Sequence, residues 1–234
     1  MVLSLLTACS KPPPPTCEDS TDTACFKGVF SGLLGGRLAD VEVCTPDLPE
    51  LPCTASDADG GWKIPGLPLD TDVVLTATTE DTFPTLFPQT TRMAWYDWYK
   101  TLLSEGIVQT QADRIGTSLE PDRGHVIFLV WEGLNIDGVN TPKIADVVVT
   151  VESGEGQVFY GNSLGLASPD ATQTTGDGSG GVLNLSPGVQ DLRFTAPGGP
   201  CSHSFSWDFE PGAAVPVPVQ AGFATGIDVI CPPE

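Results

Sequence analysis

The stretch that decides the fold is residues 57–68, which run DADGGWKIPGLP. An Asp-Gly pair is a common hairpin turn, and here it stands directly before a short apolar segment that ends at Pro and Gly residues. Residues 72–77 (DVVLTA) form a second short segment rich in β-branched and apolar residues. Short strands of this composition, bounded by turn residues, are typical of a β-sandwich. The sequence therefore predicts two neighbouring sandwich strands in this region.

A segment upstream of this stretch recurs later in the chain. Residues 38–43 (LADVEV) and 144–149 (IADVVV) are the same or similar in type at five of six positions. An apolar segment that begins with Gly precedes each copy, and a Gly- and Asp-rich turn follows it. These flanking segments are 28–30 and 124–128 before the copies, and 57–61 and 175–178 after them. Two copies predict two tandem sandwiches rather than a solenoid, which needs three or more repeats.

Composition limits the classes of function. The 234 residues include 30 Asp and Glu but only 10 Lys and Arg, for a net charge of −20. Such an acidic surface repels phosphate backbones, so nucleic acid is not an expected partner. The 26 Gly and 22 Pro residues argue against a helical bundle, while 40% hydrophobic residues allow each sandwich to bury a core. The sequence contains no apolar run near the roughly 20 residues of a membrane-spanning helix.

The N-terminal residues 1–10 resemble the end of a bacterial lipoprotein signal. Leu6, Thr7 and Ala8 precede Cys9 in the aliphatic-small-small-Cys order of a lipobox. In lipoproteins this cysteine carries a diacylglyceryl group, and the signal peptide is cut before it. The proline run 12–15 that follows is a semi-rigid spacer of the kind a tethered domain needs. The resemblance implies a lipid anchor at Cys9, and Ser10 weakly favours the outer membrane; the membrane face stays open.

The signal segment itself is short. No basic residue precedes Cys9, whereas a signal peptide begins with a basic region before its apolar stretch. We therefore expect the true translation start to lie upstream of Met1, and we exclude the apparent signal from the fold.

Six further cysteines follow Cys9, and an even number in an exported protein predicts disulfide bonds. Many pairings are open to six cysteines. Proximity in the sequence favours three pairs: Cys17 with Cys25, Cys44 with Cys53, and Cys201 with Cys231. No Cys-x-x-Cys spacing occurs, so a zinc site is not expected. Asp57 and Asp59 lack the closing ligand of a calcium loop and are interpreted as turn residues, so no metal or cofactor is predicted.

Residues 28–83 resemble the carboxypeptidase regulatory-like domain, a transthyretin-like β-sandwich. That family has a strand that begins with Gly, an L-x-x-V-x-V segment, and an Asp-Gly turn followed by an aromatic residue and Gly-Leu-Pro. Residues 57–68 are its best match here, whereas the second copy matches in outline and has a longer connection at 151–174. The tandem arrangement with a lipobox is similar to uncharacterised lipoproteins of Gram-negative bacteria. The resemblance implies an all-β fold, and such domains accompany many functions.

The predicted organisation is two transthyretin-like or Ig-like β-sandwiches joined by a segment with one amphipathic helix. Aromatic and Leu residues in the joining segment, at Trp95, Trp98, Tyr99, Leu102 and Leu103, recur at helical spacing. The predicted segments are a residual signal at 1–8, a lipid-anchored Pro-rich linker at 9–24, a first sandwich at 25–84, a helical connector at 85–122, and a divergent second sandwich at 123–234.

These features favour a non-enzymatic lipoprotein of the cell envelope that acts as a structural or interaction scaffold. Its partners would be the membrane, through the lipid anchor, and an unknown envelope protein or glycan. An alternative is a carbohydrate-binding module that uses Trp95, Trp98 and Tyr99, or the loops of 151–174. A remote alternative is a hydrolase, because residues 161–165 (GNSLG) match G-x-S-x-G, although no helix pattern follows them.

Overall fold

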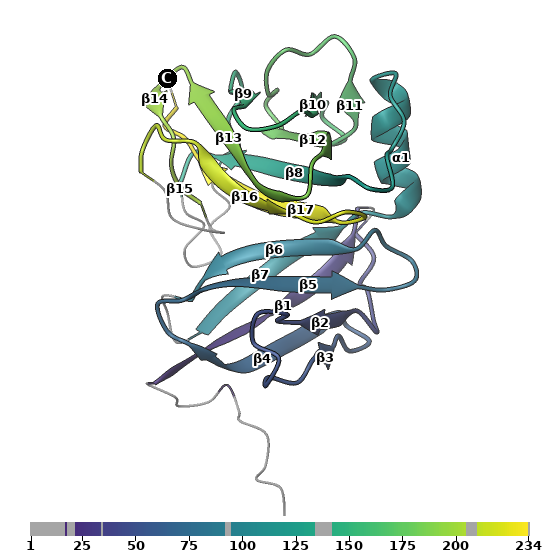
Figure 1. Ribbon diagram of the computed structural model, residues 1–234, viewed down its shortest axis with the longest axis vertical. Coiled ribbons are helices and arrows are strands. Elements are labelled where there is room, and N and C mark those ends of the chain that lie inside the picture. The colour runs from purple at the N-terminus through teal and green to yellow at the C-terminus, as the bar shows by residue number, and fades with distance from the viewer. Residues whose placement is uncertain are drawn as a thin grey trace, which may run out of the picture.

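The computed structural model describes residues 17, 22–33, 35–91, 95–133, 142–204 and 210–233, with only the backbone described at 95–97 and 202–204. Two β-sandwiches stack along the long axis, and the helix α1 (Glu105–Arg114) packs beside the second one (Figure 1). The predicted signal at 1–8 and the lipid site Cys9 lie outside the described residues. Among the described residues, no helix is long and apolar enough to span a bilayer.

The first sandwich is built from β1 to β7. One layer has the order β4–β1–β7, in which β1 (Thr23–Gly32) runs antiparallel to β4 (Gly61–Pro68) and parallel to β7 (Trp95–Leu102). The facing layer holds β3 (Thr54–Ala55), β2 (Glu42–Cys44), β5 (Asp72–Thr78) and β6 (Thr85–Thr90). Aromatic and aliphatic side chains fill the space between the layers, among them Phe26, Phe30, Trp62, Ile64, Val73, Leu75 and Phe87.

The second sandwich repeats this arrangement. β8 (Gly124–Trp131) runs antiparallel to β12 (Ser179–Leu185) and parallel to β17 (Ala224–Ile230), as β1 does with β4 and β7. The facing layer has β13 (Gly188–Ala196) between β9 (Val148–Val151) and β16 (Val215–Val219). The additional short strands are β10 (Gln157–Gly161), β11 (Ala167–Ser168), β14 (Gly199–Pro200) and β15 (Ser202–Ser204).

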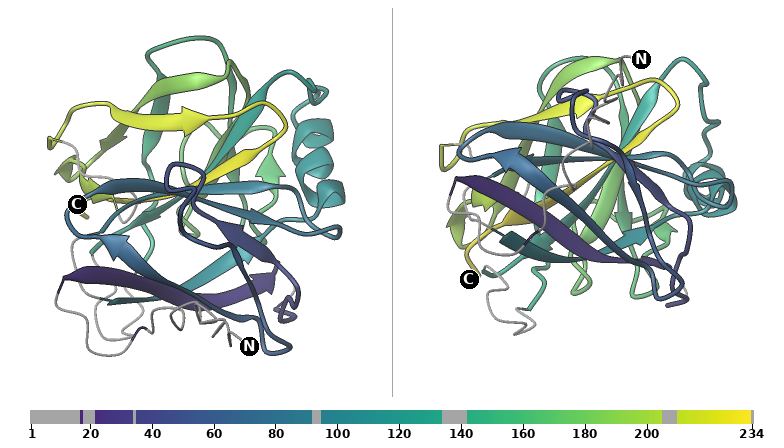
Figure 2. Two further views of the ribbon diagram at one scale, coloured as in Figure 1. Left: turned by 60° about the horizontal axis from the view of Figure 1, so that its bottom comes forward. Right: turned by 90° about the horizontal axis from the view of Figure 1, so that it is seen from below.

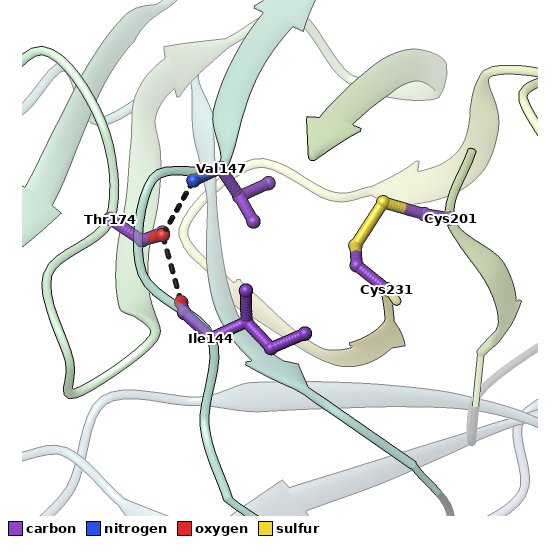
Figure 3. The surroundings of a disulfide bond; sticks show 5 residues. All are labelled: Ile144, Val147, Thr174, Cys201 and Cys231. Carbon is purple, nitrogen blue, oxygen red and sulfur yellow. Dashed lines mark hydrogen bonds between the residues drawn. A yellow bond between two sulfur atoms is a disulfide. The ribbon is translucent and has the colours of Figure 1, made fainter. Parts of the chain in front are cut away.

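A hydroxyl group fixes the recurring segment in both copies. In the second sandwich the Thr174 Oγ1 accepts a hydrogen bond from the Val147 N–H and donates one to the Ile144 C=O, both at 2.9 Å (Figure 3). In the first sandwich the corresponding hydroxyl is that of Ser56, which accepts from Val41 at 2.9 Å and donates to Leu38 at 2.7 Å. The two copies therefore share side-chain hydrogen bonds as well as strand order, which supports a duplication.

The Asp of the recurring Ala-Asp-Val has the same backbone conformation in both copies. Asp40 has a φ of 57° and Asp146 a φ of 64°, in the left-handed region that Asp tolerates better than most residues other than Gly. At the turns that follow, Gly60 and Gly178 also have positive φ, and a Cβ on either would lie 2.5 Å from a backbone carbonyl oxygen of β1 or β8. The backbone therefore restricts which residues can occupy these positions: the two Asp positions need a residue that tolerates positive φ, and the two Gly positions have no room for a Cβ.

The two sandwiches share one continuous sheet. β17 of the second sandwich pairs in parallel with β6 of the first, with Ala224 opposite Thr85 and Thr225 opposite Leu86. The Ala224 N–H also donates to the Pro84 carbonyl at 2.9 Å. This pairing places β17 beside β6 at the boundary between the halves (Figure 1).

The amphipathic helix predicted from Trp95, Trp98 and Tyr99 is wrong, because these residues form the strand β7. Parallel pairing with β1 over eight residues satisfies the backbone there, and aromatic residues favour strands as readily as helices. The helix begins later, after the N-cap Ser104, whose side chain accepts from the Ile107 N–H. Residues 85–102, expected in a helical connector, instead supply β6 and β7 to the first sandwich.

Three disulfides are present, and they are the pairs that sequence proximity favours: Cys17–Cys25, Cys44–Cys53 and Cys201–Cys231. The last of these lies in the second core, opposite Ile144 and Val147 (Figure 3). All six thiols are consumed, so the cluster of Glu42, Cys44 and Cys53 has no thiolate to offer a metal.

Replacing Thr174 with Val should destabilise the protein by about 1–3 kcal/mol, because the buried Val147 N–H and Ile144 C=O would lose their partner. Thr174→Ser keeps the hydroxyl and should stay closer to wild type. Urea unfolding of the two variants measures the difference. A loss below about 0.5 kcal/mol for Thr174→Val would show that this hydroxyl does not fix the motif.

Candidate functional site

The strand β7 points the side chains of Trp98 and Tyr99 in opposite directions. Trp98 is half-buried and packs against the first core, with its ring 5.0 Å from that of Phe26 and 5.8 Å from that of Trp62. Tyr99 is 76% exposed, and the Arg37 guanidinium lies 5.6 Å from its ring centroid. Trp98 and Tyr99 therefore do not form one stacking surface for a sugar. The backbone of Trp95 pairs with Cys25, and its side chain lies outside the described part.

The next residue of β7 connects the two sandwiches. The Lys100 Nζ forms an ion pair with the Asp228 carboxylate on β17, and the Trp131 indole N–H donates to the other oxygen of that carboxylate at 2.8 Å. Lys100 and Asp228 side chains are only 13% and 12% exposed. The ammonium also lies over the rings of Trp98 and Phe87, at 5.3 and 5.6 Å from their centroids.

This arrangement makes the contact between the sandwiches specific. A charge removed from water costs free energy unless an opposite charge and hydrogen bonds replace the water. Trp131 of the second sandwich supplies the hydrogen bond in any case, but Asp228 obtains the opposite charge only when β17 lies beside the first sandwich, because Lys100 comes from that sandwich. Sliding or tilting one half against the other would leave two poorly solvated charges unpaired. We name Lys100, Asp228 and Trp131 the junction cluster.

A histidine lies on the other side of the same junction. His125 is 1% exposed; its Nδ1 accepts from the Asn184 N–H at 3.1 Å, and its ring centroid is 5.5 Å from that of Phe83 in the first sandwich. Burial lowers the pKa of His125 to about 4, so the ring is neutral at neutral pH. Protonation would place a ring N–H against the Asn184 N–H, and would put a charge in an apolar contact.

The Asp57 turn holds its own backbone. One oxygen of the Asp57 carboxylate accepts from the N–H groups of Asp59 and Gly61, at 2.9 and 2.7 Å. This geometry agrees with the interpretation of Asp57 and Asp59 as turn residues.

The residues 161–165 that match G-x-S-x-G form the hairpin loop between β10 and β11. The Asn162 side chain accepts from the N–H groups of Leu164 and Leu166, at 2.9 and 3.2 Å. Gln111 of α1 holds the loop from the side through hydrogen bonds to Gly165 and Ala167. A strand follows the loop, whereas a nucleophile elbow leads from a strand into a helix.

The loops of 151–174, the other candidate for sugar binding, contain two aromatic residues. Phe159 and Tyr160 are 3% and 5% exposed, so neither ring is available for stacking on a sugar. The Tyr160 hydroxyl accepts from the Val149 N–H at 2.9 Å, and burial raises its pKa. Both side chains therefore act in packing.

No protein-family model matches the chain, and no curated protein matches it. The resemblance to the carboxypeptidase regulatory-like domain thus stays a prediction from the motif residues. Among solved structures, the Bacillus anthracis TIE protein is similar at 11% identity and a TM-score of 0.30, over 89% of this chain and 34% of that one. A streptococcal ancillary pilin matches at 13% identity and a TM-score of 0.27, over 92% of this chain and 64% of that one.

The shaft pilin SpaA from Lactobacillus rhamnosus GG matches at 11% identity and a TM-score of 0.26, over 89% of this chain and 98% of the pilin. This chain spans about a third of the first of these proteins and less than two thirds of the second.

Sequence reasoning missed the junction cluster. Its residues are far apart in the chain and belong to different copies of the repeat, so spacing carries no signal of their contact. One clue was present: Lys100 interrupts the apolar spacing of a segment in which Trp98 and Leu102 point inward. A Lys on the inward side of a strand requires an acidic partner from elsewhere.

Replacing Trp98 with Ala should lower the free energy of unfolding by about 3 kcal/mol, because the indole fills space between Phe26, Trp62 and Lys100. The adjacent, exposed Tyr99 is the matched control, and Tyr99→Ala should cost less than about 0.5 kcal/mol. Denaturant unfolding compares the two. Similar stability of both variants, with loss of polysaccharide binding by Trp98→Ala, would favour the sugar-binding alternative.

His125 should make the protein less stable in mild acid. Its folded pKa lies below its unfolded pKa, so the unfolded chain binds more protons between pH 4 and 6.5 and the folded state loses stability as the pH falls. We expect a loss of about 2 kcal/mol from pH 7.5 to pH 5 from this residue. In His125→Gln that part of the pH dependence should vanish, whereas His203→Gln should keep it. An unchanged pH dependence in His125→Gln would contradict the assignment.

Proposed function

We propose that this protein is a non-enzymatic lipoprotein of the bacterial cell envelope, attached through Cys9 to the outer membrane, where it acts as a structural or interaction scaffold. The observation that carries the proposal is the way its two sandwiches are joined. β17 and β6 share one sheet, and the junction cluster supplies a specific polar contact beside it. A molecule joined in this way holds its second sandwich at a fixed position relative to its first.

Three features support an exported, anchored protein. The lipobox resemblance at residues 6–9 is followed by a spacer of four prolines. All six later cysteines form disulfides, which persist in oxidising compartments and are rare in the cytosol. The disulfide Cys17–Cys25 ties the end of the spacer to β1, so a force on the anchor would reach the first sandwich at one defined point.

Three described polar residues could be taken for catalytic groups, and their surroundings favour a role without catalysis. The Ser of the G-x-S-x-G match lies in a hairpin loop, the Asp57 carboxylate is occupied by backbone N–H groups, and His125 is buried and neutral. The Asp57 carboxylate and the His125 ring each have a structural partner. The partner of the scaffold would be an envelope protein or a glycan that contacts an exposed surface of the second sandwich.

Replacing Cys9 with Ser, in a chain extended upstream to include a full signal, should abolish acylation and release the protein from membranes. The double variant Cys17→Ser/Cys25→Ser is the matched control, because it removes cysteines close to the anchor and should leave acylation intact. Palmitate labelling and membrane fractionation measure the two effects. Unchanged labelling and membrane retention of Cys9→Ser would refute the anchor.

A further inference from the structure

The loop between β2 and β3 repeats a three-residue pattern. Residues 46–51 read PDLPEL, which is Pro, an acidic residue and Leu, twice in succession. Each repeat is part of a hydrogen-bonded turn: the Leu48 N–H donates to the Thr45 C=O at 2.9 Å, and the Leu51 N–H donates to the Leu48 C=O at 3.0 Å. Proline takes the second position of each turn, where its fixed φ favours the turn. The sequence repeat is therefore also a structural repeat.

The repeat separates an inner side of the loop from an outer side. Leu48 and Leu51 are partly buried and pack against the first core. The Pro and acidic residues are exposed, and so is the proline that follows the second repeat. Because the inward residues recur every three positions, the outward ones also recur every three positions and form one surface. We name this surface the proline ridge, and it consists of Pro46, Asp47, Pro49, Glu50 and Pro52.

Three constraints hold the proline ridge in one conformation. The disulfide Cys44–Cys53 closes the loop at the end of β2 and just before β3. The two Leu side chains fasten the loop to the core, and its three prolines restrict φ. The corresponding connection of the second sandwich, residues 151–174, contains no cysteine, so the fold itself does not require this closure. A surface loop that is ordered in advance loses little conformational entropy when it binds a partner.

The negative charge of the ridge is not neutralised by its surroundings. Residues 38–62 contain six acidic residues and no Lys or Arg. Glu42 adds a carboxylate beside the ridge, because one of its oxygens lies within 4.8 Å of both sulfurs of the disulfide. Glu42, Asp47 and Glu50 take part in no ion pair with a residue that the structure describes. A partner that covers the ridge must therefore supply positive charge.

The proline ridge lies at the free end of the first sandwich. In the layer β6–β5–β2–β3, β6 pairs with the second sandwich and β3 is the strand furthest from it. The strands β2 and β3 are accordingly at the lower end of the molecule in Figure 1. When the molecule is seen from below, the first sandwich stands in front of the second (Figure 2). The second sandwich therefore leaves the ridge accessible to another protein.

We propose that the proline ridge is the contact surface for a protein partner whose groove is lined with aromatic and basic side chains. Aromatic rings pack on proline rings, as they do when Pro-rich segments are recognised, and basic side chains pair with Asp47 and Glu50. The net charge of −20 steers a basic partner towards this molecule and repels a second copy of the chain. The inference goes beyond the proposed scaffold role, because it assigns a contact surface to the first sandwich and does not depend on the lipid anchor.

The test uses the full chain with Cys9→Ser, so that the result is independent of acylation. The probe is a synthetic peptide of Arg-Trp pairs separated by Gly, titrated into isotope-labelled protein at about 150 mM NaCl while the backbone amide resonances are recorded. A second peptide, with Gly in place of Trp, measures the contribution of charge alone. Calcium chloride in place of peptide measures simple cation binding.

Three variants separate the parts of the ridge. Asp47→Asn/Glu50→Gln removes its charges, and Glu155→Gln/Asp170→Asn is the matched control, because it changes the net charge equally at exposed positions of the second sandwich. Pro46→Ala/Pro49→Ala removes two proline rings and keeps the charges. Thermal unfolding of each variant confirms that it is folded, and the charge variant alters only exposed side chains, so it provides a test even if the proline variant is unstable.

We expect the Trp-containing peptide to shift the amide resonances of residues 44–53 most, and to bind more tightly than the peptide without Trp. The charge variant should weaken its binding about tenfold and the control less than about twofold, whereas the proline variant should abolish the advantage of Trp. Resonance shifts spread over all acidic surfaces, equal losses in the charge variant and the control, equal binding of the two peptides, the same response to calcium, or no binding would each overturn the proposal. Palmitate labelling at Cys9 is scored separately, so failure of the anchor is distinguishable from failure of the ridge.

Discussion

The parallel pairing of β17 with β6 is the contact on which the rest of the structure depends. Without it, each of these strands would present unpaired backbone groups at the edge of a sheet, which invites aggregation. With it, Ala224 and Thr225 of β17 pair with Thr85 and Leu86 of β6, and the two sandwiches share one sheet. The junction cluster and the contact of His125 with Phe83 then add a polar and an apolar interaction at the same boundary. Neither could form if β17 were elsewhere.

In the described part of the chain, the corresponding edge of the second sandwich does not pair with a further strand, and the sequence of that edge explains why. β16 occupies there the place that β6 has in the first sandwich, but its sequence is Val-Pro-Val-Pro-Val. Pro216 and Pro218 have no N–H to offer to a further strand, and the Pro218 carbonyl accepts from the Thr225 hydroxyl at 2.6 Å. The first sandwich thus has an edge that accepts a strand, and the second has a blunted one. The two copies of the repeat therefore differ at this edge.

The sequence predicted the parts of the fold that depend on local chemistry. The Asp57 turn, the recurring Ala-Asp-Val segment and the tandem of sandwiches follow from residues close together in the chain. The helix at Trp95–Tyr99 was wrong because aromatic spacing over eight residues fits a helix and a strand equally, and the choice depends on β1, some seventy residues earlier. The junction cluster escaped prediction because Lys100 and Asp228 meet only through the fold of both copies.

The central claim is that the two sandwiches form one cooperative body. Differential scanning calorimetry of the Cys9→Ser chain at neutral pH tests it most directly, because cooperative unfolding makes the van't Hoff and calorimetric enthalpies equal. The shared sheet and the junction cluster predict one transition with equal enthalpies. Two resolved transitions, or a van't Hoff enthalpy near half the calorimetric one, would show that the sandwiches unfold independently and would contradict the claim.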